Sequence, residues 1–273
     1  MSQSLSEVIA PRVEEPRYLT RFVTTGSGRL TARLLVIGVV LAVWQFVPGK
    51  ALRFWMSGPT EIIARLWTWL LDGSLWEHLG ATLTAMTLGY GFGTAVGVAL
   101  GFVFGFLPKL HRVLSPYITA LYAMPKIALA PLFIIVFGIG IESRVALVAI
   151  TVFFLILNST LDGVRNVDRD LTQALALMGA TRSEVIRKVL LPAALPWIFT
   201  GMRISVRYAF TNTLLAELIS ANQGIGFLIE YYSGIFDSTG TYAAILVLVF
   251  MSVGLTELLT RVEHAMARSH GRA

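Results

Sequence analysis

The feature that most constrains this chain is its longest stretch without a charged side chain. Residues 79–108 contain no Asp, Glu, Lys or Arg. A helix rises about 1.5 Å per residue, so about 20 apolar residues cross a bilayer core that is about 30 Å thick. Only 14% of the 273 residues are charged, whereas about a quarter of the residues of a soluble domain are charged. These observations predict an all-α membrane protein.

Similar apolar stretches recur and predict six transmembrane helices. The expected spans cover residues 31–49, 79–107, 113–140, 144–161, 193–220 and 238–260. They define a transmembrane domain over residues 30–265, between an N-terminal tail (1–29) and a C-terminal tail (266–273). A charged loop over residues 165–192 separates the fourth span from the fifth. An even number of spans places both termini on the same side.

The basic residues indicate which side that is. Fifteen of the 22 Lys and Arg residues fall on the side of the termini, and four fall on the other side, namely Lys50, Arg53, Arg65 and Arg144. Cytoplasmic loops carry an excess of Lys and Arg, so both termini are expected in the cytoplasm. This bias accounts for the net charge of +6 without a nucleic-acid partner. The chain has no cysteine and its four histidines are scattered, so no metal site is expected.

Glycine recurs every fourth residue in the second predicted span. The stripe consists of Gly89, Gly93, Gly97, Gly101 and Gly105. Residues four apart share one face of a helix, and small residues let helix backbones approach closely inside a membrane. The local sequence GYGFG does not follow a predicted strand, so it is not a nucleotide-binding fingerprint. The stripe predicts a helix-packing face.

The third predicted span contains the sequence MPKIALAP. Pro125 and Pro131 each remove a helix hydrogen bond, which predicts a broken helix. Non-helical backbone at membrane depth is tolerated only inside the protein or beside water. Lys126 lies next to the break. It either reaches an interface or a backbone carbonyl, or it forms part of a translocation path.

The charged loop contains the sequence QALALMGATRSEVIRKVLLP. Good helix formers precede Gly179, a residue typical of helix C-termini, and Thr181 and Glu184 have the spacing of a capping box. The pattern predicts a helix, a glycine bend and a second helix that runs from about Thr181 to Leu191. Such a pair of helices is either a docking element for a cytoplasmic partner or an amphipathic hairpin on lipid headgroups.

This loop resembles the cytoplasmic signature of the permease subunits of binding-protein-dependent ABC importers. The signature reads E-A-A, three residues, G, nine residues, I, one residue, L-P. The chain has Gln173-Ala174-Leu175, Gly179, Val189 and Leu191-Pro192 at the matching positions, and it departs from the signature at Gln173, Leu175 and Val189. Further stretches, such as GVRNVDRDL and ELISANQGIGFLI, resemble the nitrate/sulfonate/taurine branch. The resemblance covers roughly residues 80–260.

The resemblance implies a type I ABC importer permease fold with a cytoplasmic coupling helix, in a bacterial cytoplasmic (inner) membrane. It implies a second permease subunit, most simply a homodimer, two ATP-binding subunits that hold ATP and Mg, and a periplasmic or lipid-anchored solute-binding protein. No cofactor is expected on this chain, since it lacks the Walker A pattern of nucleotide-binding loops. The residues expected to contact the ATPase are Gln173, Ala174, Leu175, Leu177, Met178, Gly179, Ala180, Thr181 and Pro192.

The fifth predicted span carries charges at membrane depth. Arg203 and Arg207 are four residues apart and share a helix face, and Asn212 and Glu217 lie further out. The arginines are expected to attract an anion, to pair with Glu217 or another subunit, or to cap carbonyls near an inner gate. Glu217 is expected to face the outer half of a cavity. The residues expected along the path or gate are Pro125, Lys126, Pro131, Arg203, Arg207, Asn212 and Glu217.

Taken with the resemblance, these features predict the membrane-spanning subunit of an ATP-driven importer for a small anion such as a sulfonate, taurine or nitrate. An importer of a pyrimidine or vitamin precursor, or of an aromatic acid, is an alternative on the same scaffold. A secondary transporter would show an inverted repeat of broken helices, and only one span is broken. A membrane-embedded enzyme would need a catalytic set such as H-E-x-x-H, which the sequence lacks.

Overall fold

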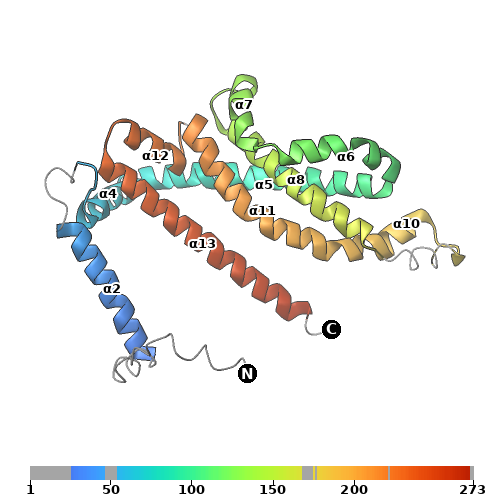
Figure 1. Ribbon diagram of the computed structural model, residues 1–273, viewed down its shortest axis with the longest axis horizontal. Coiled ribbons are helices and arrows are strands. Elements are labelled where there is room, and N and C mark those ends of the chain that lie inside the picture. Colours follow the sequence, from blue (N-terminus) through green and yellow to red (C-terminus); the bar gives the residue numbers. More distant parts are fainter. Residues whose placement is uncertain (1–25, 47–53, 168–174, 176, 221, 271–273) are drawn as a thin grey trace, which may run out of the picture. The chain divides into compact units, whose positions relative to one another are not determined.

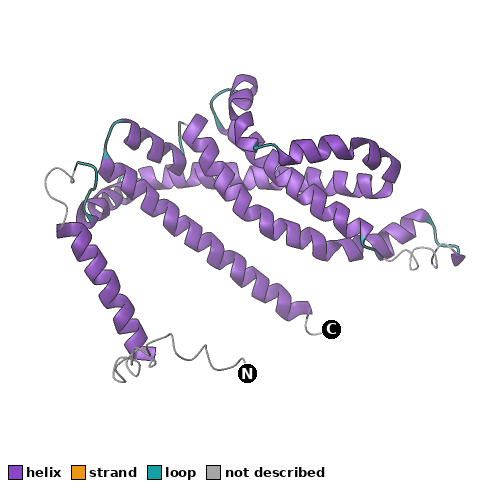
Figure 2. Ribbon diagram, in the orientation of Figure 1, coloured by secondary structure: helices purple, strands orange, loops and turns teal. Residues whose placement is uncertain are grey.

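The computed structural model describes residues 26–46, 54–167, 175, 177–220 and 222–270, and the regular elements within these ranges are all helices (Figures 1 and 2). Contacts divide the chain into two units, residues 1–61 and 62–273. The elements are α2 (Gly26–Phe46), α4 (Pro59–Leu71), α5 (Ser74–Phe106), α6 (Pro108–Ala123), the 3-10 turn η1 (Lys126–Leu129), α7 (Ala130–Phe137), α8 (Ile141–Arg165), α10 (Arg182–Val185), the π turn η2 (Ile186–Leu190), α11 (Leu191–Ser220), α12 (Ile225–Gly234) and α13 (Ser238–His270).

The first unit contains α2 and the turn that leads into α4. Gln45, near the end of α2, accepts hydrogen bonds on Oε1 from the backbone nitrogen and the hydroxyl of Thr60, both at 3.3 Å. The carboxylate of Glu61 accepts from the backbone nitrogen of Gly58 at 3.2 Å. Pro59 is the first residue of α4, where its missing N–H costs nothing. Helix α4 was not predicted from the sequence.

The glycine stripe packs α5 directly against α8. A methyl group on Gly93 would lie 2.5 Å from the carbonyl oxygen of Ala149, and one on Gly101 would lie 2.5 Å from Cβ of Thr160. Gly97 faces Ile156 in the same way, with a built methyl at 2.8 Å from its Cβ. The stripe therefore removes the side chains that would hold the two backbones apart, which confirms the predicted packing face.

The same principle brings α11 against α8. A methyl on Gly163 would lie 2.9 Å from Cβ of Trp197, and one on Gly201 would lie 2.6 Å from the hydroxyl of Ser159. Around this contact, Val164, Ala194 and Ile198 form a buried apolar cluster. Helices α5, α8 and α11 thus form the packed core of the second unit.

Four helical segments of the described chain are long and apolar enough to cross a membrane, namely Ser74–Phe106, Ile141–Arg165, Ser183–Ile219 and Ser238–Arg261. The bent pair Pro108–Ala123 and Lys126–Phe137 adds a fifth if it counts as one span. Leu30–Phe46 is apolar but shorter. The structure confirms an all-α protein with several apolar helices, but it does not confirm the count of six spans.

The helix break predicted in the third span is present. Helix α6 ends at Ala123, Met124 is extended, and the chain turns by 90° before η1 and α7. Pro125 precedes the 3-10 turn, while Pro131 lies in the first turn of α7, where its missing N–H breaks no helix bond. Only Pro125 thus marks the break, and Pro131 begins the next helix.

The end predicted for the helix after Thr181 is wrong. It does not stop near Leu191 but continues through η2 into α11, so that Ser183–Ile219 is one continuous helical segment. Within η2 the backbone nitrogen of Leu191 bonds to the carbonyl of Ile186, five residues earlier. Such a π turn gives locally wider winding, and Pro192 directly follows it inside the continuous helical segment.

Candidate functional site

The glycine bend of the charged loop ends one helix as the sequence predicted. Gly179 has φ +84°, in the left-handed region that favours glycine. The backbone nitrogen of Ala180 donates to the carbonyl oxygen of Leu175 at 3.0 Å. A bond of this span around a left-handed glycine is the Schellman motif, which satisfies a free carbonyl at a helix end.

The next helix begins with the predicted capping box. The backbone nitrogen of Thr181 donates to the carboxylate of Glu184 at 2.9 Å, and the backbone nitrogen of Glu184 donates to the Thr181 hydroxyl at 3.4 Å. Lys188 also donates to this carboxylate, at 3.1 Å. The bend is therefore fixed on both sides by hydrogen bonds rather than being an open loop.

Two large apolar side chains stand out from this bend. Leu177 is 90% exposed and Met178 is 83% exposed. Leu175 and Ala180 are half-buried, and Pro192 is exposed in the first turn of α11. The predicted contact residues Gln173 and Ala174 lie outside the described residues.

Several residues predicted for the translocation path meet in one hollow. A cavity of about 250 Å³ is lined by Pro125 and Lys126, by Tyr122 and Met124, by Thr151 and Leu155 of α8, and by Tyr208 and Asn212 of α11. Lys126 donates to the carbonyl oxygen of Tyr122 and lies 5.0 Å from the centre of its ring. The backbone contact is one of the two roles expected for this lysine, and the lysine also lines the hollow.

The two arginines of the fifth span line a second hollow. It measures about 440 Å³ and is bounded by Arg203, Ile204, Arg207, Tyr208 and Thr211, all on α11. Tyr208 lines both hollows. Three basic side chains, those of Lys126, Arg203 and Arg207, thus line these two neighbouring hollows of the second unit.

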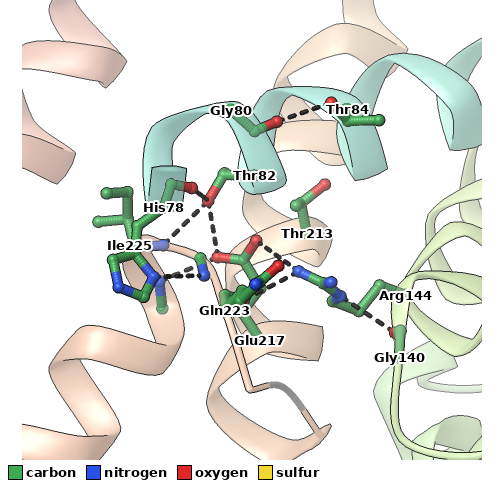
Figure 3. Close-up of polar contacts among 12 residues, drawn as sticks. His78, Gly80, Thr82, Thr84, Gly140, Arg144, Thr213, Glu217, Gln223 and Ile225 are labelled. Carbon is green, nitrogen blue, oxygen red and sulfur yellow. Dashed lines mark hydrogen bonds and ion pairs between the residues drawn. The ribbon is translucent and has the colours of Figure 1, made fainter. Parts of the chain in front are cut away.

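Glu217 lies elsewhere, inside the helix packing (Figure 3). Its side chain is 1% exposed. Contrary to the prediction, it therefore does not face a cavity of this chain. Its Oε1 lies 3.4 Å from Nη1 of Arg144, which is 2% exposed. The prediction that Arg203 or Arg207 pairs with Glu217 is wrong. Residues 10 to 14 positions apart on one helix are separated by about 15–20 Å.

The Glu217 carboxylate helps to anchor the start of α12. Its Oε2 accepts from the backbone nitrogen of Gly226 at 2.9 Å and from the hydroxyl of Thr82 at 3.0 Å. The Thr82 hydroxyl accepts in turn from the backbone nitrogen of Ile225 at 2.9 Å, and Nδ1 of His78 accepts from Gly224 at 3.1 Å. Three backbone donors at the start of a helix are thus satisfied by side chains of other helices.

Arg144 completes this buried network from α8. It donates to the carbonyl oxygens of Gly140 at 3.1 Å and Gln223 at 2.9 Å. Glycine is required at position 224, which has φ +120° and lies against the Glu217 carboxylate. Gly226 is a helical residue, and a methyl group there would lie 2.7 Å from the carbonyl oxygen of Leu214.

The sequence did not identify His78, Thr82 and Gln223 as members of this network. It also gave no sign that the side chain of Arg144 points inward. An Arg near the start of one apolar helix and a Glu near the end of another indicate a buried pair. The sequence does not give the register of α8 against α11, so it cannot assign the partners.

Comparisons with known proteins show the family to which the chain belongs. The family model of the binding-protein-dependent transport system inner membrane component matches residues 93–268. The taurine transport system permease protein TauC of Escherichia coli K12 is 31% identical over 90% of this chain and 92% of its own length. The putative aliphatic sulfonates transport permease protein SsuC of Bacillus subtilis is 31% identical over 84% of this chain and 83% of its own.

A third relative carries a different name. The riboflavin transport system permease protein RibX of Chloroflexus aurantiacus is 31% identical over 95% of each chain. Among solved structures, an inward-facing MetNI methionine ABC transporter chain superposes with a TM-score of 0.60 at 23% identity, over 72% of this chain and 96% of its own. That likeness shows the fold. The chain therefore belongs to the family of binding-protein-dependent transport system inner membrane components, and it is an ABC importer permease.

Proposed function

We propose that two copies of this chain form the membrane channel of an importer driven by two separate ATP-binding subunits. A periplasmic or lipid-anchored solute-binding protein delivers the solute, and both termini lie in the cytoplasm of a bacterial cell. The orientation follows from the excess of Lys and Arg on the side of the termini. The chain has no Walker A pattern, so hydrolysis of ATP is assigned to a partner that holds ATP and Mg.

The docking element for the ATP-binding subunit is the glycine bend at residues 175–184. The observation that carries this proposal is that Leu177 and Met178 are 90% and 83% exposed on a segment held rigid by the Schellman bond and the capping box. Exposed apolar side chains on a fixed bend are suited to fill a groove of a partner. The other possible role is contact with lipid headgroups alone.

A pair of substitutions at Gly179 tests this proposal. A methyl group at Gly179 meets nothing within 4 Å, so a side chain there faces open space and causes no clash within the chain. Asn and Asp have nearly the same shape, and both tolerate the left-handed region, so they differ mainly in charge. We expect Gly179→Asp to abolish uptake and Gly179→Asn to retain most of it, with equal amounts of both proteins in the membrane.

The control is the binding of the ATP-binding subunit to each variant, measured by co-purification. Reduced co-purification of Gly179→Asp alone would support docking through this bend. Normal uptake and normal co-purification of Gly179→Asp would contradict it.

For the solute, we propose a small anion such as a sulfonate, taurine or nitrate. Lys126, Arg203 and Arg207 line the two neighbouring hollows, and cations at membrane depth are costly unless they serve a path or a partner. The relatives named for taurine and aliphatic sulfonates point the same way. A vitamin or vitamin precursor is the second candidate, because the relative named for riboflavin is as similar in identity.

The charge at position 207 discriminates between these solutes. If an anion passes Arg207, loss of a charged hydrogen bond lowers uptake about tenfold or more in Arg207→Gln, and Arg207→Lys retains most of it. Uptake of a labelled sulfonate into vesicles measures this, and ligand binding by the cognate solute-binding protein identifies the solute independently. Equal uptake by both variants would leave Arg207 outside the path.

A further inference from the structure

A large open hollow lies away from the path residues, where α5 turns into α6. It measures about 1020 Å³ and lies between this corner, the end of α8 and the segment α10–η2. Its lining includes Phe106, Val164, Ile186 and Leu190, together with His111, Arg112 and Arg165. We call it the inner hollow, because its basic residues belong to the side assigned to the cytoplasm.

The polar rim of the inner hollow is basic. Nη2 of Arg165 lies 2.7 Å from Nδ1 of His111, which is 9% exposed. A guanidinium can only donate, so Nδ1 of this histidine accepts the bond and the ring is held in one tautomer. Arg112 lies on the same rim and is exposed. No carboxylate is among the described residues that line the hollow.

The wall of the hollow is apolar. Phe106, Val164, Ile186 and Leu190 form it. Helix α6 turns one face toward the hollow, which carries His111, Arg112 and Ser115. The exposed apolar residues Leu110, Val113 and Tyr117 lie on the opposite face of α6 and are not part of the hollow.

A basic rim beside an apolar wall matches a ligand with an anionic head and hydrocarbon chains. We propose that the inner hollow binds an anionic phospholipid, with its phosphate at Arg112 and Arg165 and its acyl chains against the wall formed by Phe106, Val164, Ile186 and Leu190. Basic pockets between transmembrane helices on the cytoplasmic side are suited to such headgroups. The proposal uses the orientation proposed above, which thiol labelling of another residue tests separately.

Lipid titration followed by native mass spectrometry tests the site on the purified permease. The probes are phosphatidylglycerol, zwitterionic phosphatidylcholine and inorganic phosphate. Each basic residue near a headgroup contributes about a fivefold gain in affinity. We therefore expect Arg112→Gln to weaken phosphatidylglycerol binding about fivefold, Arg112→Gln/Arg165→Gln to weaken it about 25-fold, and Arg112→Lys to bind as the unchanged protein does.

Arg261→Gln is the matched control, because Arg261 is an exposed basic residue that pairs with Glu257 and lies outside the hollow. It should bind phosphatidylglycerol normally. Arg112 is exposed and makes no contact on which the fold depends, so loss of binding in Arg112→Gln at unchanged thermal stability supports the site.

Four results would overturn the proposal. They are equal binding by Arg112→Gln and Arg261→Gln, equal binding of phosphatidylcholine and phosphatidylglycerol, full displacement of the lipid by inorganic phosphate, and release of the lipid when the ATP-binding subunit is added. The last result would mean that the subunit, rather than lipid, covers the inner hollow in the transporter.

Discussion

At the scale of single residues, the buried pair of Arg144 and Glu217 is the most consequential contact. Both side chains are almost fully buried, and together they hold the start of α12 against α5, α8 and α11. Two charges removed from water are stable only while each has the other and a set of hydrogen bonds. The pair therefore acts as a structural anchor, and neither side chain is available to solute.

Loss of one partner should be more harmful than loss of both. Arg144→Met leaves the Glu217 carboxylate buried without its cation, which costs about 3–5 kcal/mol of stability. Arg144→Met/Glu217→Gln removes both charges and should recover part of this loss. Thermal unfolding of the purified chain in detergent measures each variant.

The exposed pair of Arg261 and Glu257 is the control for that measurement. Its side chains are 76% and 60% exposed, and such pairs contribute about 0–1 kcal/mol. Arg261→Met should unfold close to the unchanged protein. An equal loss of stability from Arg144→Met and Arg261→Met would show that the buried network does not stabilise the fold.

At the scale of elements, the packing of α5 on α8 depends on which face of the helix each glycine occupies. Gly93 faces α8, and a methyl there would lie 2.8 Å from Cβ of Val152. Gly91 is two residues away in the same helix and has no atom within 4 Å of a built methyl. The same substitution at these two positions therefore separates the effect of helix propensity on stability from the effect of helix packing.

This difference predicts opposite effects of one substitution. Alanine favours a helix over glycine by about 1 kcal/mol, so Gly91→Ala should be neutral or slightly stabilising. Gly93→Ala should lose about 1–3 kcal/mol, because the helices must move apart. Thermal unfolding in detergent compares them, and equal midpoints would exclude close packing through the stripe.

Elements with a strong local signal could be predicted from the sequence. The repeat of four in the glycine stripe, the break at Pro125, and the cap residues Gly179 and Thr181 each have a local physical cause, and the structure has them all. The continuation of α10 through η2 could not be predicted, because a π turn that admits Pro192 has no signature in residue type. Helix α12 was missed since its start is capped by side chains distant in sequence, such as Thr82.

The site could be predicted only in part for the same reason. The structure brings Lys126 and Asn212 to one hollow and Arg203 and Arg207 to the next, and their place on a translocation path stays a prediction. Glu217 was grouped with them because it is charged and lies on the same helix. Its burial depends on tertiary contacts with α8 and α12, which helical spacing within one span does not reveal.

At the scale of the whole molecule, the chain has large apolar surfaces and no nucleotide-binding loop. Helix α13 exposes Phe250, Val253 and Leu258 at 64%, 61% and 58%. Such surfaces are stable against lipid or against other subunits rather than in water. They fit a subunit of a membrane complex.

The purified chain should therefore show no ATPase turnover on its own. Turnover should be present when the ATP-binding subunit is added, and it should rise with the loaded solute-binding protein. A colorimetric phosphate assay measures both cases. Robust ATP turnover by the chain alone would contradict the proposal that it is a non-catalytic subunit.

The most direct test of the account is the accessibility of Met178. The chain has no cysteine, so Met178→Cys introduces a single reactive thiol. A membrane-impermeant maleimide should label it in inside-out vesicles and not in intact cells, and the ATP-binding subunit should protect it. Labelling in intact cells, or labelling at the same rate with and without that subunit, would contradict docking of the motor subunit on the glycine bend.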